Sequence, residues 1–170
     1  MLNDALKKQL FSLNLPAVVM ATLGFWLSAS LLLDFVIMPV LSMAGMMNDR
    51  GFLTAGYLLF GVFNRLEVVC AATILTAFFG FRSQHLFSDR QALNGLVIAS
   101  ILFNITLIYT YLITPHLTGF SLEMLDFAEV TTMPLKMFVW HGLYWALEAT
   151  KFILGVILLR WCYRQTCAIT

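Results

Sequence analysis

The chain consists largely of four long apolar runs separated by short polar stretches. The runs extend over about residues 16–44, 52–81, 92–114 and 136–161. A helix needs about 20 mostly apolar residues to cross the roughly 30 Å hydrocarbon core of a bilayer. Every run meets that length. The pattern therefore predicts an all-α integral membrane protein in which four transmembrane helices form a bundle.

Two shorter stretches have the pattern of helices that lie on a membrane surface. Four leucines recur at helical spacing in the first 13 residues, next to Lys7 and Lys8, which predicts a short amphipathic N-terminal segment. Residues 121–130 predict an interfacial helix in the third loop. With the four spans, these segments occupy most of the chain, so residues 1–170 are interpreted as one transmembrane domain.

The positions of lysine and arginine outside the spans predict the orientation. Cytoplasmic loops of membrane proteins carry the excess of these residues. Six lie on the side of the N-terminus, the second loop and the tail: Lys7, Lys8, Arg82, Arg90, Arg160 and Arg164. Arg50 and Lys136 lie on the other side. Both termini are therefore predicted to be cytoplasmic. A plasma or inner membrane is the default, and a thylakoid or organelle membrane is equally compatible.

Composition excludes several classes of protein. Hydrophobic residues make up 61% of the chain and charged residues 11%, whereas soluble domains have about 45–50% and 25%. The net charge of +1 and the absence of a basic cluster give no reason to expect nucleic acid as a partner. Cys70, Cys162 and Cys167 are too few for a disulfide framework and do not match a metal-binding motif.

Five ionisable side chains interrupt the apolar runs: Asp34, Arg65, Glu67, Glu148 and Lys151. A charge at the centre of a transmembrane helix costs at least about 2.5–3.5 kcal/mol on insertion scales, so these groups should face inward and pair. Because there are three acids and only two bases, one carboxyl group has no basic partner. That group would be protonated, hydrogen-bonded or matched by a bound cation.

Helical spacing extends these charges into a predicted buried network. His141, Tyr144, Glu148 and Lys151 share one stripe of the fourth helix, and Asn64 and Glu67 share a stripe of the second. Arg65 is included in the network, although it points about 200° away from Glu67 around the axis. The third helix is expected to add contacts through Asn94, Asn104 and Tyr111. The predicted network comprises Asp34, Asn64, Arg65, Glu67, His141, Tyr144, Glu148 and Lys151. It is either structural or a proton or ion site.

Methionine and histidine gather toward the predicted outer side. The candidate metal ligands there are Met43, Met46, Met47, His116, Met137 and His141. Thioether and imidazole groups suit Cu(I), so a copper site is one alternative. Packing by adaptable methionine side chains is the competing explanation. His116 and His141 could instead be axial ligands of a b-type haem, which is a further alternative.

Short motifs resemble the transmembrane-protein-205-like domain family. The first is Gly24-Phe-Trp-Leu-Ser28, which continues through Asp34-Phe-Val-Ile-Met-Pro39. The others lie around Phe63-Asn-Arg-Leu-Glu67, Tyr111-Leu-Ile-Thr-Pro115-His116 and Trp140-His-Gly-Leu-Tyr144. The resemblance implies four helices and no settled activity, with a link to metal-drug resistance in some members. Tyr144, Glu148 and Lys151 depart from the family pattern and make the interior more charged.

The leading functional interpretation is a non-enzymatic accessory, assembly or scaffold subunit of a membrane complex. Its expected partners are the lipid bilayer and either another membrane protein or further copies of the same chain. Handling or transport of a small cation, proton or copper is the alternative, and a haem-binding redox protein is a third. The sequence contains no nucleophile elbow, phosphate-binding glycine loop or dinucleotide fingerprint, so an enzymatic activity is not expected. The leading interpretation requires no cofactor.

Overall fold

The computed structural model describes residues 15–44, 50–83, 88–119 and 135–168, the side chains of residues 50–53, 137 and 165–168 excepted. Within these ranges the regular structure is entirely helical. Four helices are long and apolar enough to cross a membrane: Leu15–Met43, Thr54–Ser83, Asp89–Gly119 and Phe138–Arg164. The all-α prediction with four potential spans is confirmed. The two predicted interfacial segments lie outside the described residues.

The first helix consists of α2 (Leu15–Leu32), the π-helical turn η1 (Leu33–Ile37) and α3 (Met38–Met43). The second is α4 (Arg50–Ser83). The third consists of α5 (Asp89–Ile108) and the π-helical turn η3 (Tyr109–Ile113), and stays helical over residues 114–119. The fourth is α7 (Leu135–Ala168). The third apolar run was expected to end at residue 114, before Pro115. That boundary was wrong, because the helix continues through the proline to residue 119.

The two π turns explain how these helices pass their prolines. Each π turn ends two residues before a proline, Pro39 in the first helix and Pro115 in the third. A proline ring collides with the carbonyl group four residues earlier and supplies no N–H. In both helices the residue just before the proline bonds to the carbonyl five residues earlier: Met38 N–H donates to Leu33 O, and Thr114 N–H donates to Tyr109 O. The wider turn accommodates the proline, and the helix continues.

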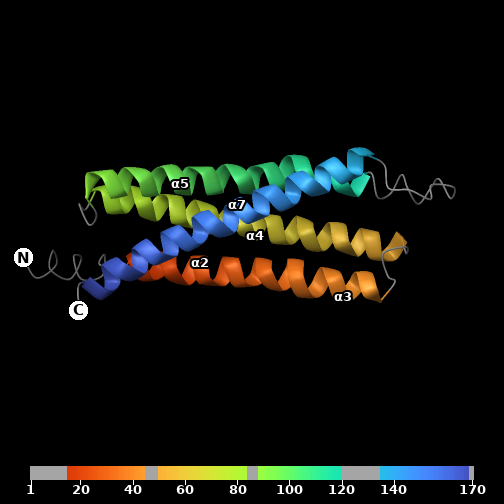
Figure 1. The fold of residues 1–170 in the computed structure, drawn as a ribbon, viewed down its shortest axis with the longest axis horizontal. Helices are drawn as coiled ribbons and strands as arrows, with labels where there is room; N and C mark the ends of the chain where they lie inside the picture. Colours follow the sequence, from red (N-terminus) through yellow and green to blue (C-terminus); the bar gives the residue numbers. More distant parts are fainter. Residues whose placement is uncertain (1–14, 45–49, 84–87, 120–134, 169–170) are drawn as a thin grey trace, which may run out of the picture.

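Three helices lie side by side in the order α2, α4, α5, and α7 crosses in front of them (Figure 1). α7 packs against α2 along one half of its length and against α5 and η3 along the other. The beginning of α2 and the end of α7 lie at one end of the bundle, here called the terminal end. The other end, where α3 ends and α7 begins, is called the opposite end.

The half of the bundle toward the terminal end has an apolar core. Its buried side chains are Val19, Leu23, Cys70, Ala71, Ile74, Ala77, Phe78, Phe81, Ala92, Ala99, Leu102, Leu158 and Cys162. Two glycines permit close packing there. A Cβ atom on Gly95 would overlap the ring of Phe78, and one on Gly155 would lie 2.9 Å from Leu27 Cδ2. Polar side chains occupy the middle of the bundle instead.

Candidate functional site

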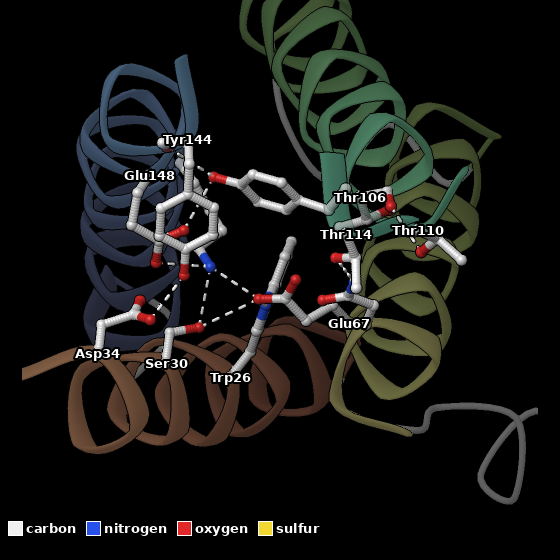
Figure 2. A network of polar contacts seen from close by, with 12 residues as sticks. Trp26, Ser30, Asp34, Glu67, Thr106, Thr110, Thr114, Tyr144 and Glu148 are labelled. Carbon is white, nitrogen blue, oxygen red and sulfur yellow. Dashed lines mark hydrogen bonds and ion pairs between the residues drawn. The ribbon is translucent and has the colours of Figure 1, made fainter. Parts of the chain in front are cut away.

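A cluster of polar side chains fills the middle of the bundle, where α7 crosses the other helices (Figure 2). Its members come from all four helices and are named here the central cluster: Trp26, Ser30, Asp34, Glu67, Tyr109, Tyr144, Glu148 and Lys151. Lys151 and Glu148 are each 1% exposed, and Glu67 is 2% exposed. These charged groups are therefore shielded from the surface of the bundle.

Lys151 is the positive centre of the cluster. Its Nζ lies 2.7 Å from Glu67 Oε1 and 2.7 Å from Glu148 Oε1. The ammonium donates hydrogen bonds to Glu67 and, at 3.0 Å, to Ser30 Oγ. The contact with Glu148, one turn earlier on α7, is an ion pair without the geometry of a hydrogen bond. One cation thus bridges two acids that come from different helices.

The first helix holds Glu67 in place. Glu67 Oε1 accepts hydrogen bonds from Trp26 Nε1 at 2.8 Å and from Ser30 Oγ at 3.2 Å, in addition to the one from Lys151. Trp26 and Ser30 are four residues apart on α2, so both side chains point to the same side of the helix. A carboxylate oxygen with three donors, one of them cationic, is well satisfied inside an apolar medium.

Two tyrosines bind the remaining carboxyl groups. Tyr109 OH donates to Glu148 Oε2 at 2.9 Å and lies 3.4 Å from the backbone oxygen of Tyr144. Tyr144 OH donates to Asp34 Oδ1 at 2.6 Å. The two tyrosine rings pack with their centroids 5.3 Å apart. Each carboxyl group of the central cluster therefore has at least one donor from another helix.

Both π turns contribute a member of the central cluster. Asp34 lies in η1 and Tyr109 is the first residue of η3. π turns are rare and occur frequently at functional sites. Since each one adds a residue to a helical turn, it rotates the side chains beyond it by about 100° relative to a regular α-helix. The wider turns thus help to set which side chains face the interior.

The polar contacts are distributed unevenly along the bundle. Lys151 lies at the midpoint of its span, and Glu148 and Tyr144 precede it by three and seven residues, toward the opposite end. Asp34 lies beyond the midpoint of its own span, on the same side. A further polar contact lies on that side as well: the buried Asn64 donates through Nδ2 to Oγ1 of the partly buried Thr114 at 2.6 Å. Toward the terminal end the core is apolar. The half toward the opposite end therefore combines polar contacts with a smaller apolar cluster around Ile105, Tyr109 and Ile113.

The structure brings most of the predicted network together. Asp34, Glu67, Tyr144, Glu148 and Lys151 all belong to the central cluster. Asn64 is buried but bonds to Thr114 instead. His141 is half-buried one turn before Tyr144 on α7.

Arg65 does not belong to the network. It is exposed on the outer side of α4, and its assignment to the interior was wrong. It lies two residues from Glu67, so the two side chains leave the helix in nearly opposite directions. Once α4 turns Glu67 inward, Arg65 must face outward.

Three members of the central cluster were missed from the sequence. Trp26 and Ser30 precede Asp34 by eight and four residues, a helical spacing that could have identified them. Tyr109 was missed because Asn94, Asn104 and Tyr111 were expected to supply the contacts of the third helix. All three of those side chains are exposed. Asn104 satisfies its amide on its own helix, where Nδ2 donates to the Ser100 carbonyl at 2.8 Å.

The candidate metal ligands are not gathered among the described residues. Met43 is 88% exposed. The His116 ring stacks on Trp140 with centroids 4.6 Å apart, and its Nδ1 lies 2.8 Å from the Leu112 carbonyl oxygen. Met46, Met47 and the side chain of Met137 lie outside the described part. Within that part, no group of three or more His, Cys, Asp or Glu residues is arranged around a possible metal position.

Comparisons of the chain with protein-family models, curated proteins and solved structures found no match. The resemblance to the transmembrane-protein-205-like domain family stays a prediction that rests on the motifs given above.

Proposed function

We propose that this chain is a proton-handling membrane protein in which carboxyl groups of the central cluster take up and release protons. The observation that carries the proposal is the excess of acid in the described interior. Asp34, Glu67 and Glu148 are buried there with a single buried cation, Lys151. Three ionised carboxylates against one ammonium would leave a net charge of −2. Each charge at the centre of a span costs about 2.5–3.5 kcal/mol on insertion scales.

Protons are the compensating charge that this geometry favours. The ammonium group of Lys151 lies within 2.7 Å of both glutamates and would repel a metal cation placed between them. Glu67 Oε1, with three donors, is the carboxylate that balances Lys151. Asp34 and Glu148 then share the exchangeable protons, each held by a tyrosine hydroxyl.

The uneven interior supports exchange with one side of the membrane. Asp34 and Tyr144 extend the polar contacts toward the opposite end, and the Asn64–Thr114 pair lies on that side. Toward the terminal end, large apolar side chains such as Phe78, Phe81 and Leu158 close the interior. The opposite end also has a small apolar cluster around Ile113, but the polar contacts that accompany it make this end the side of proton entry and exit in our proposal. The distribution of lysine and arginine predicts it to be the outer side.

Infrared spectroscopy of the reconstituted chain during a pH titration tests the proposal. The C=O absorption of protonated carboxyl groups should be present, change with pH, and lose intensity in Asp34→Asn and in Glu148→Gln. Asp89→Asn is the matched control, because Asp89 is an exposed acid in the first turn of α5. If both cluster variants kept the wild-type absorption at every pH, the interior carboxyl groups would not exchange protons and the proposal would be wrong.

The side of access is tested separately, in vesicles that hold the chain in one known orientation. A rapid pH change on the side of the opposite end should alter the carboxyl absorption at once. The same change on the side of the terminal end should act only as fast as the bulk pH equilibrates across the membrane. Equal rates from both sides would contradict one-sided access while leaving proton binding intact.

A further inference from the structure

Arg65 lies on the outer surface of the bundle, within an apolar stripe of α4. Leu58, Val62 and Val69 are exposed on the same side of the helix, because residues three, four and seven positions apart share a face. These residues with Arg65 are named here the Arg65 face. The three apolar members are suited to lipid or to another apolar helix, whereas the guanidinium group is not.

Arg65 also lies deep within its span. It is 11 residues from Thr54 and 18 from Ser83, the ends of the candidate span. At 1.5 Å per residue it is therefore about 5 Å from the midpoint, on the side of the opposite end. About 10 Å of hydrocarbon then separates it from the head groups of a bilayer with a 30 Å core. A charge at this depth is costly, and such side chains in membrane proteins usually pair with a counter-charge.

The described part of the chain offers no such counter-charge. Its carboxyl groups within the spans, Asp34, Glu67 and Glu148, are all buried in the central cluster, and Asp89 lies at the terminal end. No hydrogen bond or ion pair joins Arg65 to another described residue. A second copy packed symmetrically on the Arg65 face would bring a second arginine rather than an acid. Since no acid of the described ranges lies beside Arg65, we look for its counter-charge on a different protein.

We propose that the Arg65 face binds a transmembrane helix of a different protein, one that carries an aspartate or glutamate at the depth of Arg65. Arginine pairs with a carboxylate through two parallel hydrogen bonds, which fixes depth and rotation of the partner helix. The apolar members of the face pack against the same helix above and below the ion pair. This interface makes the chain a subunit of a heteromeric membrane complex, and it is independent of proton exchange in the interior.

Photo-crosslinking in the native membrane tests the interface. A photoreactive residue placed at Val62 or Val69 lies on the Arg65 face, and one placed at Ile153 on α7 is an exposed control away from it. Probes at Val62 and Val69 should crosslink to a transmembrane segment of another protein. That segment should be apolar along its length and contain an aspartate or glutamate. Arg65→Leu should abolish that product. Arg82→Leu, an exposed arginine in the last turn of the same helix, should leave it unchanged.

A charge exchange then tests the pairing itself. Arg65→Glu should abolish the complex, and replacing the identified partner acid by arginine should restore it. Crosslinks to a second copy of this chain, or to lipid alone, would overturn the proposal, because the Arg65 face would then meet another copy or the bilayer instead of a different protein. A product that persists in Arg65→Leu would overturn it too. Arg65→Leu adds an apolar side chain to a lipid-facing surface, so its fold is retained, and a melting curve in detergent verifies this.

Discussion

Lys151 and Glu67 form an ion pair of 2.7 Å inside the bundle, although 84 residues separate them in the chain. α7 packs mainly against α2 and α5, so the two long side chains, rather than close backbone packing, connect α7 to α4. Trp26 and Ser30 bind the same glutamate oxygen from α2. One carboxylate oxygen thereby joins three of the four helices.

Removal of the cation should destabilise the bundle strongly. In Lys151→Met, Glu67 and Glu148 lose their only ion-pair partner among the described residues. Loss of one partner of a buried pair costs about 3–5 kcal/mol because the other charge is left uncompensated. We expect a lower melting temperature in detergent and a free energy of unfolding reduced by about that amount. Lys136→Met, at an exposed lysine near the start of α7, should change stability little.

The double variant Lys151→Met/Glu67→Gln distinguishes the charge effect from a packing defect. Replacing both partners of a buried pair by uncharged groups is often close to neutral. The double variant should therefore be more stable than Lys151→Met alone. If instead it were less stable, the cost would arise from lost packing, and the ion pair would not be what stabilises this part of the bundle.

The contact between Tyr144 and Asp34 should appear as a coupling energy. Tyr144→Phe leaves a buried carboxyl group without its donor, a loss that costs about 1–3 kcal/mol. In the presence of Asp34→Ala the same substitution should cost less, because the group left unpaired is absent. A double-mutant cycle measured by unfolding in detergent should give a coupling of about 0.5–3 kcal/mol. Additive effects of the two substitutions would show that this 2.6 Å contact does not contribute to stability.

Close packing at Gly95 should make that position intolerant of a larger side chain. A Cβ atom there would overlap the Phe78 ring, and overpacking a tight core typically costs about 1–3 kcal/mol. Gly95→Ala should therefore lower the melting temperature in detergent. Gly24→Ala is the matched control: a Cβ atom at Gly24 meets no atom within 4 Å, and alanine favours a helix over glycine by about 1 kcal/mol. Equal effects at the two positions would contradict the packing described for α4 and α5.

The side that each span turns inward could be predicted only in part. On α7 the spacing of Tyr144, Glu148 and Lys151 identified a polar stripe that does enter the central cluster. On α5 the exposed Asn104 was mistaken for an interior residue. A polar side chain facing lipid can bond to a carbonyl of its own helix, as Asn104 does, so its polarity does not reveal which way it points.

The four potential spans follow from the order of residues alone, because crossing a bilayer requires only a sufficient length of apolar residues within each segment. The same order of residues indicates which segments contain costly charges. Which of these charges meet depends on how the helices pack. The rotation of each helix about its axis depends on packing against its neighbours, which turned Glu67 inward and left Arg65 outside. Likewise, packing of the third helix turned Tyr109 into the cluster and left Tyr111, two residues later, exposed.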